Sequence, residues 1–382
     1  MDDKLGESRE RVFIDLLRWG IGGTRTYARS IARRLHARYE NIWLICDEPG
    51  RRDLFPGSDP PQRVIAADFD GRSLLRRYWY QRNRLPERLR DLGATTYFVP
   101  AESTGFPTPM PGIRVVRMLR NMLPLEPAEA ARFVIHRYPF ARLRIALLRS
   151  AIRRGLPRSQ RTIVISDYSR VALSRVADLK DTVLIPHGIE PLDEGRAPLR
   201  PNAAPDGPYV LYVSAAFPYK RQLELIEAHE IAASRDPNLP ALVLVGPLTG
   251  HYGHLVERRA ARSSARVRLL GEVDATTARA LMRFAEALLF GSTCECCPNV
   301  LLEYLAAGRP ILTSSVGPMP EIGGSTVVYS DPTRPQVWAA DLLRLLKERA
   351  LAEEMALRAK ARAKDFDIES IVEQTYRALT SW

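Results

Sequence analysis

Short runs of apolar residues recur along the chain, separated by segments of helical or loop character. In the first half these runs lie at residues 12–17, 41–46, 96–99, 113–116, 162–165 and 183–185. In the second half they lie at residues 209–213, 241–245, 267–270, 287–290 and 310–313. Strands that alternate with helices indicate a parallel sheet. The pattern therefore predicts two α/β halves that follow one another.

The region between the two series differs in composition from both. Prolines and glycines recur through residues 189–208 and prevent continuous secondary structure, which is typical of a linker. Near the C-terminus, apolar positions from Ile368 to Leu379 recur at helical spacing. The predicted organisation is a first domain, a linker, a second domain and a C-terminal helical segment, at residues 1–188, 189–208, 209–363 and 364–382.

Composition supports a globular, enzyme-sized protein. With 382 residues and 46% apolar content, the chain can bury the cores of about two domains. No apolar run approaches the ~20 residues that cross a bilayer, and residues 1–8 lack the apolar core of a signal peptide. We therefore expect a cytoplasmic protein.

The four cysteines do not form a disulfide framework, because three crowd at Cys294, Cys296 and Cys297 and only Cys46 lies elsewhere. No second Cys or His pair follows at the spacing of a zinc finger. We expect reduced thiols packed near a helix start, and no metal site.

Two glutamates bracket the most informative segment of the second half. Glu295 follows the apolar run at 287–290, so a strand that ends there would bring it to the carboxyl edge of a sheet. Pro298 and Asn299 can open a helix, and Glu303 falls one turn further on. Because a helix N-terminus favours an anion, the pattern suits hydroxyl groups held beside a phosphate. Glu295 could instead merely favour the helix N-terminus.

Two other strand ends carry groups that suit phosphate. After the first apolar run, Gly22 and Gly23 belong to a glycine turn before a helical pattern, where backbone amides can approach a phosphate closely. After the first run of the second half, Lys220 and Arg221 stand before another helix, and a lysine there can neutralise a diphosphate. The alternatives are a tight turn for the glycines and a solvated side chain for the lysine.

These landmarks are similar in type and order to those of a known family. Residues 294–310 and 317–324 resemble the donor-site signature of retaining GT-B glycosyltransferases of group 1, the GT4 family. The resemblance extends over nearly the whole chain. It implies an α/β protein of the GT-B fold, with two Rossmann-like α/β/α domains and a cleft between them.

The resemblance implies roles for several residues of the second domain. Glu295 and Lys220 would be catalytic, with Glu295 on the sugar ring and Lys220 on the departing diphosphate. Glu303 would bind the ribose hydroxyls. The amides of Asn299 and Val300 would face the phosphate or the sugar.

The chain departs from the family pattern in two places. The family usually has an arginine at the position of Ala215, so Arg221 or backbone amides could hold the diphosphate instead. The family often has a His-Asp pair where this chain has Arg120 and Asn121, which could bind hydroxyl groups or be capping and packing residues. His187 matches a family element at the domain junction and could line the cleft or be a hinge residue.

By the same resemblance, Gly22 and Gly23 would face the donor phosphates and the acceptor. No Asp-x-Asp pair occurs between residues 209 and 363, so we expect neither a divalent metal at the diphosphate nor another cofactor. Retention would follow from attack on one face within a tight ion pair, with the donor phosphate helping to take the acceptor proton.

Charge adds a further expectation. The formal charge of +12 indicates attraction to a nucleotide, a lipid headgroup or nucleic acid, unless it is only a solvated surface. Nine arginines between residues 132 and 161 are interleaved with Phe140, Leu143, Leu147, Leu148 and Ile152. This amphipathic pattern suits an anionic membrane surface or an ordinary helix packed on the first sheet. A basic and aromatic stretch at residues 76–84 could contact sugar, lipid or nucleic acid.

The sequence thus predicts a transferase that moves a hexose, with mannose as one candidate, from a nucleotide sugar to a glycan or lipid-linked saccharide. The predicted process is cell-surface polysaccharide synthesis, in the cytoplasm or at the inner face of the membrane. A nucleotide-sugar epimerase of the same fold and a basic nucleic-acid-binding α/β protein are the alternatives. The paired glutamates fit the transferases better, and the absence of a recognition motif leads us to expect no nucleic acid partner.

Overall fold

The computed structural model forms two compact units and describes residues 10–17, 23–57, 62–67, 69, 73–100, 110–136, 140–190 and 199–382. Unit 1 comprises Met1–Asn121, Ala146–Gly188 and Ile368–Trp382, and unit 2 comprises Met122–Ile145 and Ile189–Asp367. Residues 122–145 group with the second unit, although the sequence analysis placed them in the first domain. Their ionic and aromatic contacts within unit 2, described below, account for this difference.

Unit 1 is built on a seven-stranded sheet in which all neighbouring strands are parallel. The strands are β1 (Val12–Leu16), β2 (Ile42–Asp47), β3 (Val64–Ala67), β4 (Thr96–Val99), β5 (Arg114–Met118), β6 (Arg161–Val164) and β7 (Thr182–Leu184). Their spatial order is β3-β2-β1-β4-β5-β6-β7. The interior strand β1 pairs with β2 on one side and β4 on the other, and all five of its residues are buried.

Helices connect these strands. They are α1 (Gly23–Tyr27), a π-helical turn (Ala28–Ala32), α2 (Arg33–Arg38), α3 (Glu48–Leu54), α4 (Leu74–Asn83), α5 (Leu85–Asp91), α8 (Asp167–Ser174) and the C-terminal α16 (Ile368–Thr380). Helix α7 (Ala141–Gly155) runs across the boundary between the residues of the two units. The N-cap of α8 is a capping box of Ser166 and Ser169, in which each side chain accepts the other's backbone amide.

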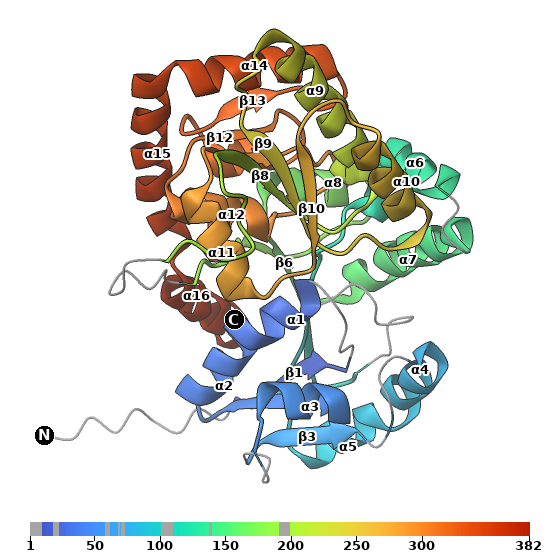
Figure 1. Ribbon diagram of the computed structural model, residues 1–382. Coiled ribbons are helices and arrows are strands. Elements are labelled where there is room, and N and C mark those ends of the chain that lie inside the picture. Colours follow the sequence, from blue (N-terminus) through green and yellow to red (C-terminus); the bar gives the residue numbers. More distant parts are fainter. Residues whose placement is uncertain are drawn as a thin grey trace, which may run out of the picture. The chain divides into compact units, whose positions relative to one another are not determined.

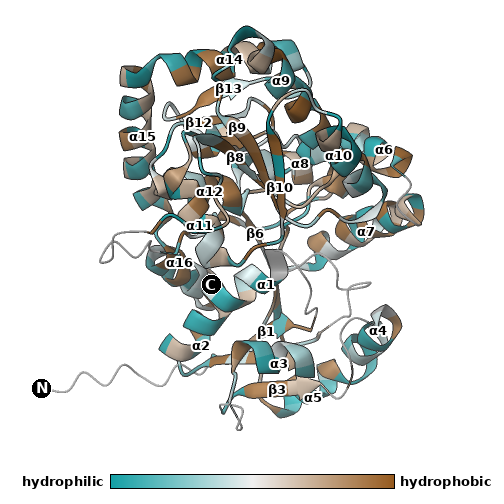
Figure 2. Ribbon diagram, in the orientation of Figure 1, coloured by the Kyte–Doolittle hydropathy of each residue, from teal (hydrophilic) through white to brown (hydrophobic). Residues whose placement is uncertain are grey.

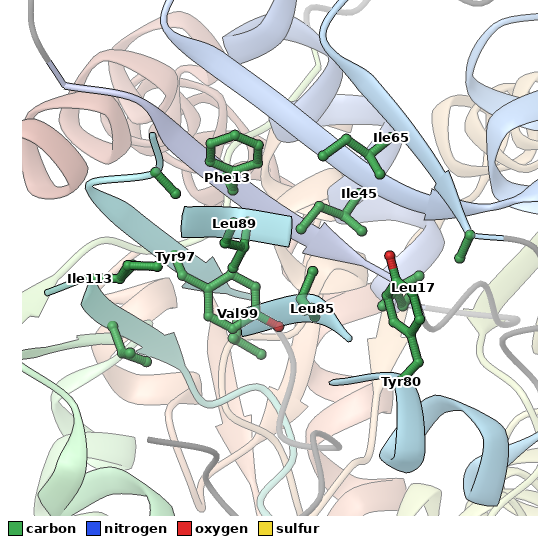
Figure 3. Close-up of a cluster of buried hydrophobic side chains, with 13 residues drawn as sticks. Phe13, Leu17, Ile45, Ile65, Tyr80, Leu85, Leu89, Tyr97, Val99 and Ile113 are labelled. Atoms are coloured by element: carbon green, nitrogen blue, oxygen red, sulfur yellow. The ribbon is translucent and has the colours of Figure 1, made fainter. Parts of the chain in front are cut away.

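A buried apolar cluster lies on one face of the unit 1 sheet (Figure 3). Phe13, Ile45 and Val99 project from three neighbouring strands, and Leu85 and Leu89 project from α5. Successive residues of a strand point to opposite faces, so these apolar side chains gather where α5 covers the sheet. Burial of one such leucine contributes roughly 1.5–3 kcal/mol to stability.

The C-terminal helix α16 belongs to unit 1. The rings of Tyr39 and Tyr376 are stacked with their centroids 3.6 Å apart, and Arg34 Nε lies 3.1 Å from a carboxylate oxygen of Glu369. Gly188 allows the chain to pass close to this helix, since a Cβ there would lie 2.9 Å from the Cα of Ile368. Close packing against Ile368 therefore explains why a glycine follows His187.

Unit 2 has a six-stranded parallel sheet. Its strands are β8 (Tyr209–Val213), β9 (Ala241–Val245), β10 (Val267–Gly271), β11 (Ala287–Phe290), β12 (Ile311–Ser314) and β13 (Val328–Ser330). The order is β10-β9-β8-β11-β12-β13, so the direction of winding reverses between β8 and β11. Ligands of open α/β sheets bind outside the carboxyl ends of the strands at such a switch point.

The helices of unit 2 cover both faces of its sheet. They are α6 (Pro127–Ile135), α9 (Gln222–Arg235), α10 (Gly250–Ala261), α11 (Ala275–Phe284), α12 (Asn299–Ala307), α13 (Met319–Gly323), α14 (Pro335–Lys347) and α15 (Arg349–Ala363). Figure 1 shows α9 and α10 on one side of the sheet and α11 and α12 on the other. Figure 2 shows β8 and β9 in the brown of apolar residues, as expected for strands covered on both faces.

The predicted strands are confirmed to within one or two residues at their ends, and so is the helix near the C-terminus. The sequence analysis missed β3 and β13, which are the short edge strands of the two sheets. Among the described residues, no helix combines the length and the apolar character that crossing a bilayer requires.

Candidate functional site

The switch point of unit 2 brings two loops together. β8 and β11 are parallel neighbours, so their carboxyl ends lie at the same edge of the sheet. The loop after β8 contains a short 3₁₀ turn, Pro218–Lys220, before α9. The loop after β11 leads through Glu295 to α12. Lys220 and Glu295, far apart in sequence, thus meet at one edge.

Lys220 and Glu295 form a direct ion pair. Each side chain is 15% exposed, so the pair is shielded but still open to solvent. The Ser292 hydroxyl donates a hydrogen bond of 2.5 Å to the same carboxylate oxygen of Glu295. The ammonium group of Lys220 also lies 5.2 Å from the centroid of the Phe290 ring. These contacts fix a cation and a carboxylate side by side at the end of β11.

The N-terminus of α12 points its free amides toward the same edge. Pro298 is the N-cap and has an extended backbone, with no side chain bonded to the first turn. The amides of Asn299 and Val300 therefore have no intrahelical acceptor. Gly308 ends the helix in the left-handed conformation, with φ of 63°.

Glu303 lies one turn into α12 and is partly buried. Burial raises the pKa of its carboxyl group, and the nearby charge of Arg279 opposes this shift. Within the described part of the chain, the side chain of Glu303 forms no hydrogen bond and no ion pair. It is therefore a desolvated carboxylate with free acceptor capacity, which is a costly arrangement unless a ligand satisfies it.

Arg221 has a different environment from the one expected of a donor-binding residue. Its side chain is only 3% exposed. The guanidinium donates to Glu129 at 2.6 Å, to Glu224 at 3.0 Å and to the Thr293 hydroxyl at 3.2 Å. These contacts occupy the guanidinium inside the protein and do not favour a direct contact with a diphosphate. Ala215, where the family usually has an arginine, contributes its backbone carbonyl to Gln222.

The remaining predicted residues belong to unit 1. His187 is buried, with its ring centroid 6.5 Å from that of Tyr27, and burial, aided by the charge of Arg120, lowers its pKa well below the usual range. Asn121 follows β5 and is partly buried. Their place in a cleft stays a prediction. Gly23 is the first residue of α1, and Gly22 lies outside the described residues.

Sequence reasoning missed three residues that support this site. Ser292 and Thr293 follow β11 after a single glycine, and a polar pair after a buried strand was the available signal. The Thr293 amide donates to the backbone carbonyl of Tyr219 at 2.8 Å, which joins the two loops. Glu129 gave no local signal, because its partner Arg221 lies 92 positions later in the chain.

Within the described residues, no three His, Cys, Asp or Glu side chains come together as a metal site would require. An Asp-x-Asp pair does occur at Asp365 and Asp367, just after the predicted second domain, which ends at residue 363. Asp365 pairs with Arg362 at 2.7 Å, and the backbone of Asp367 forms a bridge with Ile189. The side chain of Asp365 and the backbone of Asp367 are thus both engaged in contacts close to the end of α15.

Two parallel α/β units, with a lysine, an acid and a helix N-terminus at the switch point of the second, are the arrangement of the GT-B fold. The chain belongs to the group 1 glycosyltransferases. Residues 197–364 match the model "Glycosyl transferases group 1", and residues 21–191 match the model "Glycosyltransferase Family 4". The GT-B fold and the group 1 family expected from the sequence are confirmed, and retention stays a prediction.

Relatives with assigned names are distant. A D-inositol 3-phosphate glycosyltransferase of Jonesia denitrificans is 29% identical over 176 residues, 43% of this chain and 40% of that protein. The O-antigen chain mannosyltransferase B of Escherichia coli is 27% identical over 177 residues, 44% of this chain and 45% of that protein. Each alignment thus spans less than half of the relative. All of these names are transferases, and none favours the epimerase alternative.

The solved structure of Anabaena Alr3699/HepE in complex with UDP and glucose is similar over nearly its full length. The TM-score is 0.70 at 17% identity, and the alignment covers 98% of this chain and 100% of that one. At this identity the similarity establishes the shared fold.

Proposed function

We propose that the protein is a retaining glycosyltransferase that moves a hexose from a nucleotide sugar to a glycan or lipid-linked saccharide. One arrangement carries the proposal. At the switch point of unit 2, the Lys220–Glu295 pair, the free amides at the start of α12 and the unpartnered carboxylate of Glu303 share one helix and one strand edge. A diphosphate matches the ammonium group of Lys220 and the helix amides, a sugar matches Glu295, and a ribose matches Glu303.

The charge that develops during transfer explains the lysine. The bond from the anomeric carbon to the diphosphate oxygen breaks with its electron pair, so the departing diphosphate becomes more negative. A fixed ammonium group and two helix amides stabilise that charge, and loss of one such group typically lowers the rate ~10²–10³-fold. The acceptor oxygen bonds to the anomeric carbon from the same face, and its proton passes to an oxygen of the donor phosphate. No other co-reactant is needed.

The two glutamates act on hydroxyl groups in this proposal. Glu303 accepts hydrogen bonds from the ribose, which offsets the unfavourable burial of its carboxylate. Glu295, held by Lys220 and Ser292, accepts from the transferred sugar. Arg221 joins the loop after β11, through Thr293, to helix α9, through Glu224. In this proposal Arg221 supports the loop and does not bind the diphosphate directly.

Mannose is the candidate sugar, and cell-surface polysaccharide synthesis is the candidate process. The name of the Escherichia coli relative, an O-antigen chain mannosyltransferase, supports both. The UDP and glucose in the HepE structure support a nucleotide-sugar donor. The experiment below therefore varies both the nucleotide base of the donor and the acceptor.

The test is a panel of UDP-, GDP- and ADP-hexoses, with nucleoside diphosphate release followed with and without saccharide acceptors. The proposal expects acceptor-dependent release from one donor, and proton NMR should show the donor's anomeric configuration in the product. An inverted product would contradict retention. An absence of release from every donor, with no donor raising the melting temperature, would contradict the transferase assignment.

We also propose that the protein works at the inner face of the membrane, through α7. Phe140, Leu143 and Leu147 recur at helical spacing and are 82%, 59% and 54% exposed. The helix carries no acidic residue. Its flanking arginines form no ion pair with a described residue; they are Arg142, Arg144, Arg149 and Arg153. An apolar row between unpaired cations is complementary to an anionic lipid surface, where each cation contributes ~1 kcal/mol.

Sedimentation with lipid vesicles tests this contact. The wild-type protein should pellet with phosphatidylcholine vesicles that contain phosphatidylglycerol and should remain in solution with phosphatidylcholine alone. Leu143→Glu combined with Leu147→Glu should abolish pelleting. Leu357→Glu is the matched control, because Leu357 is 73% exposed on α15. Equal pelleting of all variants, or none by the wild type, would contradict the proposal.

A further inference from the structure

Helix α6 comes from the first half of the sequence but packs on the loop that carries Lys220. The ring of Phe133 lies 6.1 Å from that of Phe217 and 6.5 Å from that of Tyr219, between centroids. Phe217 and Tyr219 are themselves stacked at 5.5 Å. Beyond the end of α6, His136 meets Tyr252 edge to face at 4.9 Å. Helix α6 therefore packs against the loop between β8 and α9, which carries Lys220 and is called the lysine loop.

An ion pair links the same helix to the residue after Lys220. Glu129 accepts a hydrogen bond of 2.6 Å from Arg221, and the two side chains are 12% and 3% exposed. Arg221 also pairs with Glu224, its neighbour on α9, at 3.0 Å. Removal of one member of a buried pair leaves an uncompensated charge, so each of these carboxylates constrains the arginine.

The backbone of Arg221 explains why this constraint matters. Its φ is 57°, in the left-handed region that residues other than glycine adopt only when their surroundings hold them there. Its guanidinium also donates to Thr293, whose amide binds the carbonyl of Tyr219. The residues before and after Lys220 are thus both fastened to the loop that carries Glu295.

We propose that Glu129 is a positioning residue for glycosyl transfer. It holds Arg221 in the left-handed conformation and so keeps the ammonium group of Lys220 beside Glu295, where the diphosphate departs. Glu129 touches neither donor nor acceptor in this account. The proposal rests on the proposed function, since it assumes that Lys220 stabilises the leaving group.

The test is Glu129→Gln, which keeps the size of the side chain and removes its charge. Turnover should fall roughly 10–100-fold, as expected when a reacting group is displaced by a fraction of an ångström to an ångström. The KM for the donor should change less than about twofold, because the groups that bind the ground state remain. Hydrogen exchange of the amides at residues 217–224 should become faster, with or without substrate.

Glu230→Gln is the matched control. Glu230 pairs with Arg259 in the same unit, with its side chain 17% exposed, and it does not contact the lysine loop. This variant should leave turnover and exchange at 217–224 unchanged. Glu129 also lies 3.5 Å from Arg132, one turn further along α6. In the background of Arg221→Gln, Glu129→Gln should lower turnover by less than about twofold more, because the proposed effect on Lys220 passes through the contact between Glu129 and Arg221.

The outcomes separate the two proposals. Normal turnover of Glu129→Gln in a folded, active protein would overturn the positioning role, whatever its exchange behaviour. Faster exchange in Glu129→Gln, with a wild type that transfers no sugar, would support the link between α6 and the loop and overturn the proposed function. A larger KM with unchanged kcat would assign Glu129 to donor binding instead and overturn the positioning role.

Discussion

Glu303 combines burial with free acceptor capacity, and this has opposite consequences for stability and for binding. Because burial raises its pKa above the unfolded value, the folded protein binds this proton more tightly than the unfolded chain does. The charged carboxylate therefore destabilises the free protein as pH rises through the folded pKa. The same charge makes it a good acceptor for ribose hydroxyl groups.

The prediction is that Glu303→Gln raises the melting temperature of the free protein at neutral pH and weakens binding of the nucleotide sugar. The gain in stability should vanish as pH falls toward the ordinary carboxyl range, where the wild-type group is protonated. Melting curves across pH and calorimetric titration with donor measure the two effects. Unchanged donor affinity in the folded variant would remove Glu303 from the site.

For individual residues, the sequence predicted which side chains belong to the site better than it predicted which side chains contact one another. Glu295 and Lys220 could be proposed because each follows an apolar run and precedes a helix. Their direct contact depends on β8 and β11 being neighbours, which the order of strands along the chain does not reveal. The burial of Arg221 depends on Glu129, and a pairing between such distant residues leaves no local pattern.

Among the elements, the turn after β9 holds the start of the lysine loop. Gly246 has a φ of 134°, and a Cβ there would lie 2.3 Å from the carbonyl oxygen of Ser214. The Ser214 amide donates to the carbonyl of Val245 at 2.7 Å, so the two strand ends are in close contact. A side chain at Gly246 must push this loop away from the sheet.

Gly246→Ala should lower the free energy of unfolding by about 1–3 kcal/mol, as overpacking and backbone strain do. It should also slow transfer, since the displaced loop carries Lys220. Gly271→Ala is the control, because Gly271 has a φ of 67° but no atom within 4 Å of its Cβ position. Equal losses in the two variants, by urea unfolding, would assign the effect to backbone strain and contradict the clash.

Elements in the interiors of the two sheets could be predicted, because their strands are buried on both faces and read as continuous apolar runs. The edge strands β3 and β13 were missed, and shortness and partial burial do not explain this, since the edge strand β7 is three residues long, more exposed, and was predicted. Residues 122–145 group with unit 2 by contact, although the Glycosyltransferase Family 4 model matches them together with the rest of the first half. Their grouping with unit 2 comes from Glu129 and Phe133, whose partners lie far along the sequence.

For the whole molecule, buried histidines predict a loss of stability in acid. Burial lowers the pKa of four histidines, namely His36, His136, His187 and His229. Below about pH 6.5 the unfolded chain takes up protons that the folded chain does not. The free energy of unfolding therefore decreases as the pH is lowered. Each such group can contribute up to about 1.4 kcal/mol per pH unit until its folded pKa is reached.

His187 should contribute most clearly, because its pKa lies well below the usual range. Urea unfolding of the wild type at pH 7.5 and 5.5 should show lower stability at the acidic pH. His187→Asn should reduce this difference, whatever its effect at neutral pH. An unchanged difference would show that His187 does not take part in the acid destabilisation.

A second property of the whole protein is its predicted independence of metal. If Lys220 and the α12 amides stabilise the departing diphosphate, transfer should survive EDTA. The rate in EDTA should stay within about twofold of the untreated rate, since no leaving-group stabilisation is removed. Loss of activity with EDTA and recovery with Mg²⁺ or Mn²⁺ would leave the fold intact and contradict this mechanism.

The central claim is that Lys220 stabilises the transition state of glycosyl transfer more than it stabilises bound donor. The direct measurement is kcat together with the dissociation constant of the donor, for wild type and Lys220→Ala. We expect kcat to fall ~10²–10³-fold while the dissociation constant changes less than ~10-fold, with partial recovery in Lys220→Arg. A folded Lys220→Ala variant with wild-type kcat, or one whose loss lies entirely in donor affinity, would contradict the account.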